Sequence, residues 1–148
     1  MFDHPAYKLH IKNLNMCIKT SEDFWKLEFK FGEMLNRTKF ISFKYVWLQG
    51  FIEQTTGKEN EILIVGDHTG KVKVTHCNTV PGGSSWLVKG KYCSVVGSLI
   101  RESGMPEVAA IKLTDLSKNP VLASMWPYEV EELTKLHTEQ AMPKLPGS

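Results

Sequence analysis

Histidine and cysteine are the side chains here that could ligate a metal ion or act as a nucleophile, and their spacing suits neither role. They are His4, His10, His68, His76 and His137, together with Cys17, Cys77 and Cys93. Even the neighbours His76 and Cys77 lie on opposite faces of a predicted strand, so they cannot easily coordinate the same metal ion. The sequence also lacks a phosphate-binding loop, a G-x-S-x-G elbow and an H-E-x-x-H pair. We therefore predict no enzymatic activity, no metal site and no cofactor.

A second possible chemistry is base stacking, because residues 24–51 interleave aromatic rings with cations. The rings are Phe24, Trp25, Phe29, Phe31, Phe40, Phe43, Tyr45, Trp47 and Phe51, and the cations are Lys26, Lys30, Arg37, Lys39 and Lys44. Rings that fill a core while cations face water explain the same pattern, and burial tendencies favour this interpretation. The net charge of +2 is also small for a protein that binds the phosphate backbone of a nucleic acid. We expect little intrinsic DNA binding, and a single-stranded DNA-binding protein remains the alternative function.

A third possibility is protein binding through an apolar strip around one lysine. In the strand Glu107–Leu113, we expect Ala109, Ile111 and Leu113 to fill the core, which leaves Val108, Ala110 and Lys112 outside. Apolar area around an isolated charge marks an interaction surface, although residue type alone favours a plain solvated lysine at Lys112.

The strand Val46–Glu53 gives a similar expectation. If Val46, Leu48 and Ile52 point inward, Trp47 and Phe51 point outward. Both strands would then present apolar side chains on the outside of the same fold.

The elements that must position these residues are short strands separated by turn signals. We predict strands at Val46–Glu53, Glu61–Gly66, Lys71–Cys77, Lys91–Glu102 and Glu107–Leu113. Gly97 in the fourth strand marks a bend. Together they predict a small Greek-key barrel of the oligonucleotide/oligosaccharide-binding (OB) type, with an SH3-like barrel as the alternative. OB-folds that bind single strands offer rings on their second and third strands, and these two strands carry none.

The ends of the chain are less regular. Phe24–Phe31 is expected to be a strand, whereas Tyr7–Cys17 fits either a strand or a helix. We expect one domain over residues 1–140, followed by a flexible tail at 141–148.

A C-terminal helix is predicted to begin with Asn119 as its cap and Pro120 at its first position. Pro127 should kink or restart this helix, because proline removes a backbone donor. One apolar stripe follows helical spacing: Leu122, Met125, Trp126, Val130, Leu133 and Leu136. Periodicity does not decide whether this stripe covers its own barrel or a partner.

The odd number of cysteines and the absence of a C-x-x-C pair fit a reducing compartment. No secretory signal and no apolar stretch of membrane-spanning length are visible, so we expect an intracellular protein with no membrane contact.

Four segments resemble RecQ-mediated genome instability protein 2 and its relatives, in the same order and spacing. They are "VWLQG", "GKYCSVVGSL", "IKLTDLSKNPV" and "SMWPYEVEEL", which lie between Val46 and Leu133. The resemblance implies a single OB-fold that pairs with the C-terminal OB-fold of RecQ-mediated genome instability protein 1. That pair joins a Bloom-type RecQ helicase and topoisomerase III alpha in the nucleus. The assembly dissolves double Holliday junctions, and the family member is its structural subunit. The joined surface also docks a peptide of the Fanconi anaemia complementation group M protein.

The resemblance further implies which residues meet the partner. Lys112 matches an interface lysine, Trp126 matches a tryptophan near the partner surface, and Lys8 matches an N-terminal lysine beside that tryptophan. Together with the apolar residues above, the expected partner-binding set is Lys112, Trp126, Lys8, Val108, Ala110, Trp47, Leu122, Val130 and Leu133. Residues 1–45, the loop Asn78–Lys89 and Pro127 depart from the family pattern.

Overall fold

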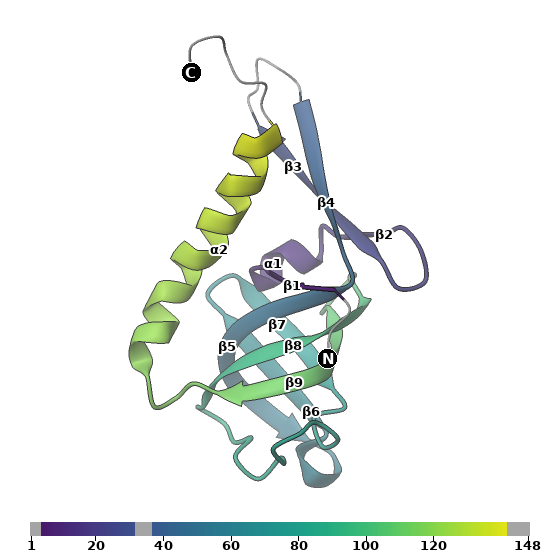
Figure 1. Ribbon diagram of the computed structural model, residues 1–148. Coiled ribbons are helices and arrows are strands. Elements are labelled where there is room, and N and C mark those ends of the chain that lie inside the picture. The colour runs from purple at the N-terminus through teal and green to yellow at the C-terminus, as the bar shows by residue number, and fades with distance from the viewer. Residues whose placement is uncertain (1–3, 32–36, 142–148) are drawn as a thin grey trace.

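The computed structural model describes the backbone of residues 4–31 and 37–141, and the side chains of residues 4–28 and 40–136. Five strands form a closed barrel with the order β5-β6-β7-β9-β8 and back to β5, as Figure 1 shows. They are β5 (Tyr45–Thr56), β6 (Ile62–Asp67), β7 (Gly70–Thr75), β8 (Tyr92–Arg101) and β9 (Glu107–Asp115). Neighbours are antiparallel except for the parallel pair β7 and β9. This closed arrangement of five strands is an OB-fold, so the predicted barrel type is confirmed.

The barrel core follows from alternation along the strands. Val46, Leu48 and Ile52 of β5 are buried, as expected, while Phe51 between them is half exposed. The predicted bend at Gly97 coincides with a register shift between β8 and β9. A side chain at Gly97 would run into the carbonyl of Ala109, so glycine lets the two backbones approach closely.

Before the barrel, the segment Tyr7–Cys17, which fits either a strand or a helix by its sequence, has part of a strand and a short helix. Strand β1 (Ala6–Lys8) pairs in parallel with the start of β5, and helix α1 (Ile11–Leu14) follows it. Ile11 and Leu14 are buried, and the backbone N–H of Ile11 donates to the Asp67 carboxylate at 3.0 Å. The N-terminal segment is therefore anchored to the barrel.

A second, three-stranded sheet stands beside the barrel and consists of β2 (Ile18–Lys19), β3 (Trp25–Phe31) and β4 (Arg37–Phe43). The predicted strand at Phe24–Phe31 is confirmed. The inner face of this sheet buries Trp25, Leu27, Ile41 and Phe43. The indole Nε1–H of Trp25 donates to the Leu99 carbonyl at 3.1 Å, which ties this sheet to β8.

Helix α2 (Pro120–Ala141) runs along one side of the molecule, from beside the barrel up to the second sheet (Figure 1). It begins at Pro120, as predicted. Of the two outcomes expected at Pro127, a kink or a restart, the restart does not occur, since the helix continues through this residue. A short 3-10 turn, η1 (Lys58–Asn60), joins β5 to β6. No helix among the described residues is long and apolar enough to cross a membrane. Apart from Ala141, the predicted tail lies outside the described residues.

Candidate partner interface

Lys112 lies on the outside of β9, as expected, but the faces of this strand are not the predicted ones. Opposite Val96 and Gly97, β9 pairs through Lys112 and Ala110, so Ile111 is an extra residue in the strand. Such a bulge reverses the alternation. Val108 (0% exposed) and Ala110 (9%) therefore fill the core together with Leu113, while Ile111 is exposed. The expectation that Val108 and Ala110 face outward is wrong, and neither can contribute to an outer surface.

A cavity of about 310 Å³, here called the lysine hollow, surrounds Lys112. Its walls include Ala6 of β1, Trp47 of β5 and Val96 of β8. The Nε1–H of Trp47 donates to the Ser94 hydroxyl at 2.8 Å, which fixes the ring in the wall. Within the part of the chain that the structure describes, no carboxylate forms an ion pair with Lys112. The hollow is thus mainly apolar with one unneutralised cation at its edge.

Lys8 joins the lysine hollow to helix α2. Its ammonium lies 4.8 Å from the ring centroid of Trp47 and 5.9 Å from that of Trp126, and the two rings are 6.1 Å apart. Lys8 also pairs with the Glu129 carboxylate at 3.9 Å. The expected neighbourhood of Lys8 and Trp126 is therefore present. Cation–π contacts and an ion pair hold the first strand and the last helix together at this point.

Helix α2 turns two of its predicted contact residues toward its own barrel. Trp126 is 2% exposed and Val130 is 1% exposed, whereas Leu122 and Leu133 are partly exposed. A partner cannot reach Trp126 or Val130 across the outer surface, because the fold itself covers them. These two side chains hold the helix in place, and Leu122 and Leu133 border the exposed side.

A second cavity of about 670 Å³, here called the helix hollow, opens along α2. Ala6, which also lines the lysine hollow, lies in its wall with Lys8 and Leu133. The outer side of α2 adds four exposed apolar side chains, which are Val121 (57%), Met125 (50%), Tyr128 (69%) and Leu136 (50%). These four residues, here called the outer stripe, recur at helical spacing. Met125, Tyr128 and Leu136 also line the helix hollow, together with Glu129 and Glu132. The two hollows and the outer stripe therefore make one continuous, mainly apolar surface.

Sequence reasoning missed part of this surface. Met125 and Leu136 were assigned to the same stripe as Trp126, and Val121 and Tyr128 were not assigned to any surface. Apolar residues occupy more positions of α2 than one helix face can hold, and this pattern in the sequence indicates a second apolar side. A helix that is apolar on more than one side has a second surface to cover.

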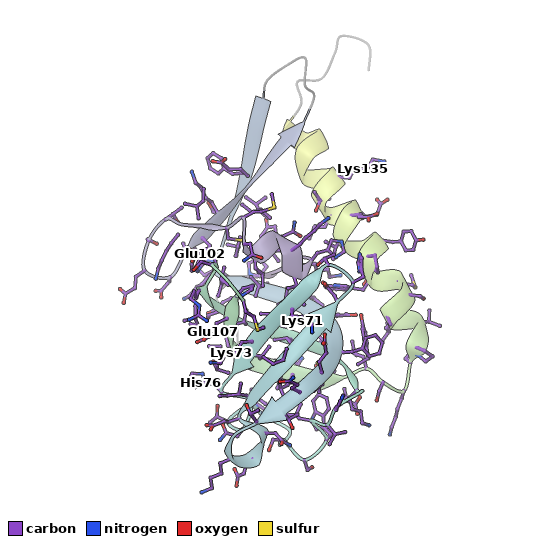
Figure 2. The ribbon with its side chains drawn as sticks, turned by 180° about the vertical axis from the view of Figure 1, so that it is seen from behind. Lys71, Lys73, His76, Glu102, Glu107 and Lys135 are labelled. Atoms are coloured by element: carbon purple, nitrogen blue, oxygen red, sulfur yellow. The ribbon has the colours of Figure 1, made fainter. Side chains whose placement is uncertain are left out.

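The face of β7 is different in character, as Figure 2 shows from behind. Lys71 pairs with Glu53 at 3.0 Å, and Lys73 pairs with Glu107 at 3.7 Å. Glu107 also forms an ion pair with Arg101 at 3.7 Å. Paired charges of this kind are typical of a surface that stays in water.

The aromatic and basic residues mostly serve the fold. Trp25 and Phe43 are buried, whereas Phe40 is 53% exposed. The ammonium of Lys26 lies 5.0 Å from the Phe40 centroid and 3.4 Å from the Glu28 carboxylate, so its charge is already neutralised. The side chains of Phe29, Lys30, Phe31, Arg37 and Lys39 lie outside the described residues. The described part of this segment offers no row of free rings beside free cations.

The cysteines are buried thiols. Burial is the main cause that raises the pKa of Cys17, Cys77 and Cys93, each to about 12. Such thiols are poor nucleophiles at neutral pH. Among the described residues, no group of three or more His, Cys, Asp or Glu side chains could hold a metal ion.

Solved structures with a similar fold are OB-fold proteins. The telomere capping protein Ten1 of Saccharomyces pombe superposes with a TM-score of 0.57 at 16% identity, over 88% of this chain and 99% of that one. A chain of a replication protein A heterotrimer bound to single-stranded DNA gives a TM-score of 0.61 at 10% identity, over 90% and 95%. At these identities the similarity concerns the fold alone.

Sequence relatives are more specific. RecQ-mediated genome instability protein 2 of Gallus gallus is 38% identical over 96 residues, which are 65% of this chain and 70% of the relative. The protein of the same name from Mus musculus is 40% identical over 88 residues, 60% of this chain and 57% of the relative. Residues 5–134 match the family described as RecQ-mediated genome instability protein 2. This match spans the barrel, Lys8, Lys112 and most of α2, and the chain belongs to the RecQ-mediated genome instability protein 2 family.

Proposed function

We propose that this chain is a non-catalytic structural subunit that pairs its barrel with the C-terminal OB-fold of RecQ-mediated genome instability protein 1. The observation that carries the proposal is the continuous apolar surface formed by the lysine hollow, the helix hollow and the outer stripe. A contiguous apolar surface with a cation at its edge is typical of a protein interface. Family membership supports a role in genome stability.

In this proposal, the paired barrels join a Bloom-type RecQ helicase and topoisomerase III alpha in the nucleus and help dissolve double Holliday junctions. The joined surface also receives a peptide of the Fanconi anaemia complementation group M protein. Residues 1–140 act as one unit, because β1 and α2 are tied through Lys8.

The partner-binding residues in this proposal are Lys112, Lys8, Trp47, Leu122 and Leu133, with the outer stripe beside them. Lys112 selects the partner, since its ammonium is not neutralised by a described carboxylate and its surroundings exclude water once a partner is seated. A carboxylate of the partner would then fix the register of the two barrels. Trp126 and Val130 act indirectly, by holding α2 at the angle that presents the outer stripe.

Co-purification of Lys112→Glu with the partner OB-fold tests this function. A central contact costs about 2–4 kcal/mol when it is lost, so we expect the complex to weaken by roughly 30-fold or more. Lys58→Glu on the exposed turn η1 is the matched control and should bind like the wild type. Circular dichroism should show both variants folded. If Lys112→Glu and Lys58→Glu bind equally well, the lysine hollow is not the interface.

A further inference from the structure

A third cavity, of about 430 Å³, lies between the first half of α2 and the strands β5, β6 and β8. It is here called the aromatic hollow, because Phe51, Tyr92 and Trp126 line it. The rings of Phe51 and Tyr92 meet edge to face, with centroids 4.9 Å apart. Tyr92 is held in position by its hydroxyl, which donates to Gln49 Oε1 at 2.9 Å. Phe51 is half exposed, so one ring of this cavity is open to an incoming group.

The aromatic hollow also contains hydrogen-bonding groups that the fold does not use. The Nε1–H of Trp126 is buried and has no acceptor among the described residues. Pro127 has no N–H, so the carbonyl of Ala123 lacks the donor that a helix normally supplies four residues later. Ala123 and Pro127 both line the cavity. A buried donor without an acceptor costs free energy in the free protein.

The lining of the aromatic hollow includes Asp67, a carboxylate that no described lysine or arginine neutralises, together with Glu53 and His68. Glu53 pairs with Lys71 at 3.0 Å. Asp67 accepts hydrogen bonds from backbone N–H groups and a hydroxyl, at 2.6–3.1 Å, and no described lysine or arginine pairs with it. Burial is the main cause that raises the pKa of Tyr92, and Cys93, Asp67 and Glu129 contribute to the increase. This field opposes phosphate and attracts cations.

We propose that the aromatic hollow binds the side chain of an arginine residue in a protein partner. A guanidinium is flat enough to stack on the half-exposed Phe51 ring. Its five N–H groups suit the Ala123 carbonyl, which receives no N–H from Pro127, and the nearby carboxylates. The Trp126 indole lines the same cavity and reports on its occupancy. A lysine provides a positive charge, but it has no planar group that can stack on a ring and no set of N–H donors in one plane.

A seven-residue peptide with one central arginine among alanines and glycines tests the proposal on the full-length chain. Its binding is followed through the Trp126 indole ¹H–¹⁵N resonance by NMR titration. We expect a saturable shift, and at least a tenfold weaker response when citrulline, the neutral analogue of the same shape, replaces arginine. Phe51→Ala should weaken binding by about two- to fivefold, the range of an exposed cation–π contact.

Phe40→Ala is the control for this variant, because Phe40 is equally exposed but lies on the second sheet. It should bind the arginine peptide like the wild type. Glu53→Gln provides a second variant that should weaken binding without removing a ring. Equal responses to arginine and citrulline, or to arginine and lysine, would overturn the proposal. So would a shift of the Trp126 resonance by oligothymidylate in place of the peptide.

Discussion

Replacing Trp126 by alanine should destabilise the isolated chain, although the family resemblance pointed to this residue as a partner contact. The side chain is 2% exposed and packs against the Trp47 ring, with Lys8 over both. A buried aromatic covers about 200 Å², and about 25 cal/mol per Å² gives an upper value of roughly 5 kcal/mol. Tryptophan to alanine changes in cores cost roughly 3–5 kcal/mol.

Because α2 packs on the barrel from one side only, we expect the lower end of that range, about 3 kcal/mol. For a chain of this size, the melting temperature should then fall by roughly 6–12 °C. Thermal and urea unfolding followed by circular dichroism at 222 nm measure the change. Met125→Ala is the matched control on the same helix, because its side chain is 50% exposed. It should alter the free energy of unfolding by less than about 0.5 kcal/mol and yet weaken pairing with the second OB-fold.

Comparison of Trp126→Ala with Met125→Ala tests which side of α2 packs on the barrel. An unchanged urea midpoint for Trp126→Ala would mean that the indole does not hold the helix on the barrel. Equal destabilisation by Met125→Ala would mean that the outer stripe is in contact with the fold.

Three further predictions concern the barrel and its surface. Gly97→Ala should lower the free energy of unfolding, measured in urea titrations, by about 2 kcal/mol or more, because its new methyl group meets the Ala109 carbonyl. Gly70→Ala gains only an ordinary contact at 3.5 Å, so it should lower the free energy of unfolding much less. The three buried thiols should react with iodoacetamide at pH 8 only when urea unfolds the chain, and rapid alkylation of the native chain, seen by mass spectrometry, would contradict this. The free energy of unfolding should also fall as pH rises above about 9. The unfolded thiols lose their protons there, while the folded ones, with a pKa of about 12, keep them. Fluorescence anisotropy with labelled single-stranded DNA should show weak binding with a shallow salt dependence, and tight, salt-sensitive binding would favour the alternative function.

The barrel was predictable because its five strands carry clear alternation and turn signals. Gly97 even identified the bend in β8. Of the N-terminal 45 residues, only the strand at Phe24–Phe31 was predictable, since β1 and β2 are three and two residues long and depend on pairing with other segments. Tertiary contacts, which no local pattern shows, define such short strands.

The candidate site was only partly predictable for two physical reasons. The extra residue Ile111 reverses the faces of β9, and a bulge of one residue leaves no composition signal at that position. For α2, periodicity located the apolar residues but not the direction in which each one points. Lys112, Lys8 and Trp47 lie on the predicted surface, whereas Val108, Ala110, Trp126 and Val130 are inside the fold.

The contact among Lys8, Trp47 and Trp126 has a consequence for how the protein is made. Lys8 belongs to β1 and Trp126 to α2, so a ribosome completes the contact only after the whole stretch from residue 8 to residue 126 has been made. Any partner that docks across this junction discriminates against incomplete or misfolded chains, because in them β1 and α2 have not met. Assembly at this surface would then also select the chains in which β1 and α2 are correctly packed.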